Sequence, residues 1–216
     1  MKTIAIIITC VIFSAQVWAV NEELKEALEG SLLKLHTAET PDEARDAVNM
    51  LERISLAAPD TWQVHYHYAY GNVMLSFRES DAGAKDQLLD KAEAAIEKGQ
   101  QAGGDPSELL TLQAFVYQAR ISADGSRAMQ YSGKARNTLG KALEINPDNP
   151  RALFLNGQNI FHTPTAFGGG SENALPWFEK SVKNFRSNTS ASAIDPSWGE
   201  EAAQAMLQQC KVVEKQ

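Results

Sequence analysis

Four histidines and two cysteines are the side chains of this sequence best suited to bind a transition metal. His65 and His67 lie two residues apart, so on a helix they point to different faces and cannot ligate one ion. No acidic or cysteine side chain stands at helical spacing beside them, and His36 and His162 are distant in the sequence. Zinc sites need several such ligands held together. The sequence therefore predicts no metal site and no cofactor.

Three consecutive glycines, Gly168 to Gly170, precede a predicted helix. Glycine N–H groups and a helix N-terminus both favour an anion, but the lysine and hydroxyl spacing of a P-loop is absent here. Thr163-Pro164 is typical of a helix end, and glycine permits the positive φ angles of a tight turn. We therefore favour a turn in which Phe167 packs into the hairpin. A small-molecule pocket beside this loop stays open as the alternative.

The sequence shows no recognisable set of catalytic residues. We find no nucleophile–base pair and no paired-acid motif, which are the usual sequence signs of hydrolytic enzymes. The sequence therefore predicts a protein that is not an enzyme.

The N-terminus resembles an export signal. Lys2 supplies a positive start, residues 4–13 form an apolar run too short to span a bilayer, and Val17-Trp18-Ala19 offers a cleavage site. We expect a signal peptide over residues 1–19, a mature domain over 20–216, and a secreted or periplasmic protein with no membrane span after cleavage. An uncleaved anchor is the competing interpretation.

Charge and cysteine content exclude several partners. The net charge is −7, with no basic patch to neutralise phosphates, which argues against a nucleic-acid partner. Cys210 is the one cysteine after the signal segment, so an intramolecular disulfide is excluded. We expect it to be buried on an apolar stripe of the last helix with Ala202, Ala205 and Met206.

Helices are predicted throughout the mature chain, because apolar residues recur at three- and four-residue spacing. The start signals are regular: Thr40-Pro41-Asp42-Glu43 and Asp105-Pro106-Ser107-Glu108 combine an N-cap, a first-turn proline and a capping-box acid. Asn149-Pro150 and Asp195-Pro196 supply the cap and the proline, and Asp60 followed by Gln63 supplies the cap and the box. We expect nine helices over residues 21–37, 41–57, 60–78, 83–101, 106–121, 125–145, 150–162, 172–186 and 196–213.

Small residues repeat at a fixed period. Gly71, Ala114 and Gly157 are 43 residues apart, each midway along the first helix of a pair. In the second helices Ala92 and Ala135 are also 43 apart, and Ala174 follows after 39. Two series with one period predict a stack of helical hairpins in close contact.

The segment Lys141–Asn149, KALEINPDN, resembles the end of a tetratricopeptide repeat and its turn into the next. Ala142 corresponds to the small residue of that family's second helix and Pro147 to the proline that closes the repeat. His67–Asn72, HYAYGN, is similar to a first helix one repeat earlier. The period is longer than the roughly 34 residues of the family. The resemblance covers residues 40–186 and implies an all-α fold, a right-handed superhelix of about four hairpins plus a C-terminal capping helix.

The resemblance also implies a partner-binding groove along the first helices. The family's groove positions correspond here to His65, Tyr68, Asn72, Phe115, Gln118, Arg151, Phe154, Gln158 and Phe161. Aromatic and amide side chains on one face suit an extended peptide or a helix. The simpler interpretation is that the phenylalanines among them belong to the core.

Two functions follow as hypotheses. The first is an exported scaffold that binds a protein or peptide through the groove. The second is a small-molecule or solute-binding accessory protein, with a pocket near Gly168 to Gly170.

Overall fold

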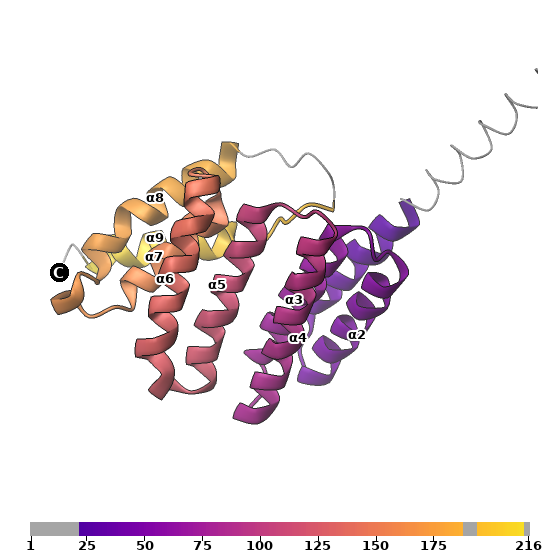
Figure 1. Ribbon diagram of the computed structural model, residues 1–216. Helices are drawn as coiled ribbons and strands as arrows, with labels where there is room; N and C mark the ends of the chain where they lie inside the picture. Colours follow the sequence, from indigo (N-terminus) through magenta and orange to yellow (C-terminus); the bar gives the residue numbers. More distant parts are fainter. Residues whose placement is uncertain (1–21, 188–193, 214–216) are drawn as a thin grey trace, which may run out of the picture.

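The computed structural model describes residues 22–187 and 194–213, and its secondary structure in these ranges is helical (Figure 1). A helix over residues 22–37 precedes eight labelled α-helices. These are α2 (Pro41–Ala57), α3 (Trp62–Ser76), α4 (Ala82–Gln101), α5 (Pro106–Ala123), α6 (Ala128–Ile145), α7 (Pro150–Phe161), α8 (Ser171–Ser187) and α9 (Glu200–Val213). The all-α prediction is confirmed, and the predicted boundaries agree within three residues except at the start of α9. The expected signal peptide lies outside the described residues.

Consecutive helices pack side by side as hairpins (Figure 1). The pairs are α3 with α4, α5 with α6, and α7 with α8, while α5 also contacts both α3 and α7. The first helices α3, α5 and α7 thus form one face of the molecule, which we call the first-helix face. None of the helices in the described ranges combines the length and apolar character needed to cross a bilayer.

Helix caps form where the sequence predicts them. The Thr40 hydroxyl accepts a hydrogen bond from the Glu43 N–H at 3.2 Å, and the Glu43 carboxylate accepts the Thr40 N–H at 3.3 Å. Asp105 accepts the Glu108 N–H at 3.0 Å. Such caps satisfy backbone donors that have no partner inside the helix.

The predicted start of α3 was wrong. This helix begins at Trp62 after Thr61, whose side chain makes no capping bond. Gln63, expected to complete a box with Asp60, instead donates from Nε2 to Asp195 Oδ1 at 3.1 Å. The long-range hydrogen bond between Gln63 and Asp195 therefore replaces the local capping box.

The repeating small residues mark close helix contacts. A Cβ on Gly71 would lie 2.9 Å from Leu51 Cδ1, and one on Gly157 would lie 2.7 Å from Phe178 Cε1. The alanines of both series, Ala92, Ala114, Ala135 and Ala174, are fully buried, and so is Ala142. Pro147 is exposed in the turn between α6 and α7. The 43-residue spacing therefore marks positions at which neighbouring helices are too close together for a larger side chain.

The last helix differs from its prediction. It begins at Glu200 rather than at residue 196, and Gly199 has φ +107°. Its buried stripe consists of Ala203, Leu207 and Cys210, so Cys210 is buried as expected, whereas Ala202 and Ala205 are exposed. The expected stripe was therefore wrong at Ala202 and Ala205, whereas Met206 is half-buried and packs against the core.

Candidate functional site

Five of the nine side chains implied for partner binding are buried. These are His65, Tyr68, Asn72, Arg151 and Phe154, whereas Phe115, Gln118, Gln158 and Phe161 are partly exposed. The His65 ring bonds through Nε2 to the Pro59 carbonyl at 2.8 Å. α3 is enclosed because α2, α4 and α5 all pack on it. The five buried side chains have intramolecular roles, and partner binding by the other four stays a prediction.

The first-helix face is covered by residues 194–199, which we call the C-terminal strap. His67 donates from Nε2 to the Ile194 carbonyl at 2.8 Å, and burial lowers the pKa of His67 to about 4, which keeps its ring neutral. Trp198 stacks on Tyr70 with ring centroids 5.2 Å apart and on Phe115 at 5.4 Å. Among the nine side chains implied for partner binding, the strap therefore stacks on Phe115.

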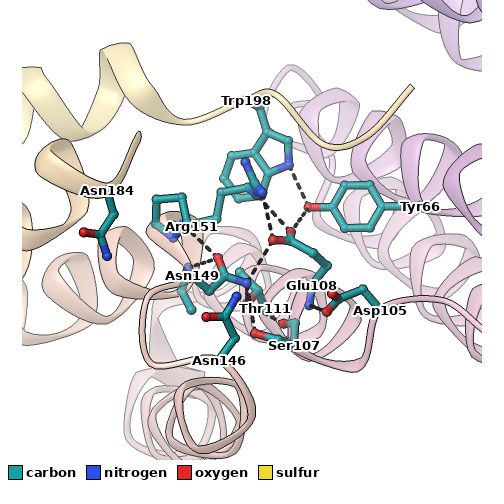
Figure 2. A network of polar contacts seen from close by, with 12 residues as sticks. Tyr66, Asp105, Ser107, Glu108, Thr111, Asn146, Asn149, Arg151, Asn184 and Trp198 are labelled. Atoms are coloured by element: carbon teal, nitrogen blue, oxygen red, sulfur yellow. Dashed lines mark hydrogen bonds and ion pairs between the residues drawn. The ribbon is translucent and has the colours of Figure 1, made fainter. Parts of the chain in front are cut away.

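A buried polar network anchors the strap (Figure 2). Trp198 Nε1 donates to the Tyr66 hydroxyl at 2.8 Å, and that hydroxyl donates to Glu108 Oε2 at 3.2 Å. Arg151 donates to the same carboxylate from Nε at 2.9 Å and from Nη2 at 2.8 Å. Burial raises the pKa of Tyr66 well above its usual value, so its hydroxyl remains a donor. A bidentate pair of this kind fixes geometry as well as charge.

The same network fixes the turn between α6 and α7. Asn149 Nδ2 donates to Glu108 Oε1 at 2.9 Å and to Ser107 Oγ at 3.0 Å (Figure 2). Its Oδ1 caps α7 by accepting the backbone N–H groups of Arg151 and Ala152. The turn is thereby joined to α5, and the residues just before Asn149 are held in place.

An apolar cleft lies where this turn meets α8. Its volume is about 490 Å³, within the range of ligand sites in proteins. It is lined by Leu143, Pro147, Leu153, Pro176, Trp177 and Lys180. These residues come from α6, the turn, α7 and α8, so four consecutive segments form its walls.

Hydrogen bonds from α8 hold the turn against that helix. Lys180 Nζ donates to the Pro147 carbonyl at 2.8 Å, and Ser181 Oγ donates to the Pro150 carbonyl at 2.8 Å. Asn184 Nδ2 donates to the Asp148 carbonyl at 3.0 Å. The walls of the apolar cleft are therefore positioned without a ligand, which lowers the entropy cost of binding one.

A second cleft of about 470 Å³ shares Lys180 with the first, and we call it the lysine cleft. It is lined by Glu108, Asn146, Asp148, Pro150, Lys180, Lys183, Asn184 and Ser187. The hydrogen bond from Lys180, at 3.1 Å, lowers the pKa of the Asp148 carboxyl, and the charge of Lys183 acts in the same direction. Within the described ranges Lys183 itself forms no ion pair.

The glycine loop behaves as a turn. The N–H groups of Gly168, Gly169 and Gly170 donate to the carbonyls of Thr165, Pro164 and Ile160, so they are not directed at an anion. Gly168 and Gly170 have positive φ, as expected for the tight turn. The packing expected for Phe167 was wrong, since its side chain is 78 % exposed. The internal bonds of the loop hold the backbone without that side chain.

Sequence reasoning missed the apolar cleft as a site. The sequence analysis identified Pro147 as a repeat-closing proline and did not connect it with Trp177. The available signal was Pro176-Trp177 followed by Lys180 on one helix, which combines apolar rings with a cation. The α6–α7 turn that completes the site is placed by Glu108 and Asn149, which are distant in sequence from α8.

Comparisons with known proteins place the chain in a family. No family model matches it, and no curated protein matches it. Among solved structures it is similar to the HusA haemophore from Porphyromonas gingivalis, with a TM-score of 0.78 and 31% sequence identity. The match covers 89% of this chain and 93% of that chain. The chain therefore belongs to the family of the HusA haemophore.

Proposed function

We propose that this protein is an exported haem carrier that binds haem in the apolar cleft and does not transform it. The observation that carries the proposal is the pre-formed cleft of Trp177, two prolines and two leucines, with Lys180 at its edge. The relationship to a haemophore supplies the class of ligand. Export is supported by the apolar N-terminal segment and by the same relationship.

Haem suits this lining chemically. Its macrocycle is flat and largely apolar, so burial against an indole ring and aliphatic side chains is favourable. Among the described residues that line the apolar cleft, none is a histidine, cysteine, methionine or tyrosine, the side chains that usually hold haem iron. Burial of the ring, rather than a bond to iron, is therefore the main source of affinity in this proposal.

A spectrophotometric titration of the purified mature chain with haemin tests the proposal. We expect a saturable shift of the Soret band at one equivalent. Trp177→Ala should weaken binding by roughly tenfold or more, because a large apolar contact of about 1.5–3 kcal/mol is lost.

The matched control is Phe167→Ala, which removes an exposed aromatic ring at the glycine loop. We expect it to bind haemin like the wild type. Loss of binding in Phe167→Ala but not in Trp177→Ala would move the site to the glycine loop. No saturable binding by the wild type would overturn the proposed function.

The architecture is proposed to be a divergent tetratricopeptide-like right-handed superhelix. The 43-residue spacing of Gly71, Ala114 and Gly157, and the contact of α5 with both α3 and α7, support this arrangement. A crystal structure in which the three hairpins relate by one repeated right-handed rotation would bear it out. Hairpins related by unequal rotations would refute it.

A second candidate is binding of a peptide or protein by the first-helix face. One observation favours it: this face already binds an extended segment, with His67 and Gln63 holding Ile194 and Asp195. A partner in trans would have to displace Trp198. Trp198→Ala should then increase the cross-linking of envelope proteins to this face, and equal cross-linking by the wild type and the variant would exclude the candidate.

A further inference from the structure

The apolar cleft and the lysine cleft meet at one residue. Lys180 lines both, and its ammonium lies 3.1 Å from Asp148 Oδ1 of the second and 2.8 Å from the Pro147 carbonyl of the first. An apolar surface thus continues directly into a polar one. A ligand that fills both would need an apolar body and a charged or polar edge.

The positive charge of the lysine cleft favours a ligand whose polar edge is anionic. Two lysines three residues apart on α8 lie on the same side of that helix. Asp148 is bonded to Lys180 and Asn184, while Lys183 has no ion pair within residues 22–187 and 194–213. Glu108, at the inner end of the cleft, is already neutralised by Arg151. One positive charge therefore remains available, in a chain whose net charge is −7.

We propose that the two clefts form one amphipathic site, in which Lys180 and Lys183 bind the carboxylates of a flat apolar ligand. The inference rests on the proposed function and adds a rule of selectivity to it: the cargo is a tetrapyrrole with free carboxylates along one edge. Lys183 binds one carboxylate with its unpaired ammonium. Lys180 exchanges Asp148 for the other and keeps its bond to the Pro147 carbonyl.

The experiment compares protoporphyrin IX with its dimethyl ester, each titrated into the mature chain in the same detergent. The ester keeps the ring and removes both negative charges. We expect the acid to bind more tightly, and its affinity to fall as salt is raised, because ion pairs at an exposed rim are screened. The affinity for the ester should be unaffected by salt.

Three variants assign the effect to residues. Lys183→Gln should weaken binding of the acid by roughly two- to fivefold, the range of an exposed ion pair, and leave the ester unchanged. The double variant Lys180→Gln with Lys183→Gln should abolish the preference for the acid. Lys98→Gln, on the distant helix α4, is the matched control and should behave like the wild type.

The outcomes separate the two proposals. Equal affinity for acid and ester in the wild type overturns the inference while the proposed function stands. A preference for the acid that survives in the double variant also overturns it. If neither porphyrin binds, the proposed function fails, and the inference fails with it. Because Lys183 has no intramolecular ion pair within the described ranges, its variant tests binding with little effect on folding.

Discussion

Removal of the charge on Glu108 should destabilise the protein far more than removal of an exposed carboxylate. Glu108 is 8 % exposed, and its carboxylate accepts four hydrogen bonds, from Arg151 Nε and Nη2, Asn149 Nδ2 and the Tyr66 hydroxyl. In Glu108→Gln the side chain keeps its size but loses its charge. Arg151, which is 5 % exposed, then has a buried guanidinium without its counter-ion.

We expect Glu108→Gln to lower the free energy of unfolding by about 3–5 kcal/mol, the cost of breaking a buried ion pair. For a chain of this size that corresponds to a fall in Tm of roughly 6–20 °C. The assay is urea denaturation followed by circular dichroism. Tryptophan fluorescence measured in parallel reports on Trp62, Trp177 and Trp198 together, and Trp198 is joined to the carboxylate through Tyr66.

The matched control is Glu179→Gln on α8. Glu179 pairs with Lys211 at 3.7 Å, but both side chains are about half exposed, so its loss should cost no more than about 1 kcal/mol. If Glu108→Gln also costs less than about 1 kcal/mol, the network is not a source of stability. That result would also remove our explanation of how the α6–α7 turn is held.

Two further predictions concern packing and pH. Gly157→Ala should lower the free energy of unfolding by about 1–3 kcal/mol in urea denaturation, because its Cβ would meet the fully buried Phe178 ring. Gly140→Ala, with open space around its Cβ, should be neutral or stabilising. Equal effects of the two substitutions would refute the close contact. Burial lowers the pKa of His67 from 6.5 to about 4, so between these pH values the ring is protonated in the unfolded chain but neutral in the folded one. The free energy of unfolding should therefore fall as the pH drops from about 6.5 to about 4, by up to about 3 kcal/mol. Denaturation at pH 7 and pH 4.5 measures the loss, and a His67→Gln variant with the same loss would contradict the assignment.

Local signals in the sequence predict most of the fold. The caps at Thr40, Asp105 and Asn149 form as expected, because each requires only residues within one helical turn. The spacing of Gly71 and Gly157 likewise predicts the close helix contacts, since a small side chain is required wherever the pattern repeats. These features depend on short-range geometry that the sequence displays directly.

The features that the sequence did not predict depend on distant contacts. Residues 194–199 carry the start signal Asp195-Pro196, yet they form a strap because Trp198 stacks on Tyr70 and Phe115 from two other hairpins. The same strap stacks on Phe115, one of the side chains that the resemblance assigned to a partner. The apolar cleft also joins α8 to a turn whose position depends on Glu108. No local pattern around Trp177 contains that information.

The most direct test of the account is to map the porphyrin on the protein by NMR. A diamagnetic, iron-free protoporphyrin is titrated into the ¹⁵N-labelled mature chain, and amide and indole shifts are followed. Haem carriage through the apolar cleft predicts changes at the Trp177 indole and at the backbone of Leu143, Leu153 and Lys180. Changes confined to the first-helix face around Trp198 and Phe115, or no change at all, would contradict it.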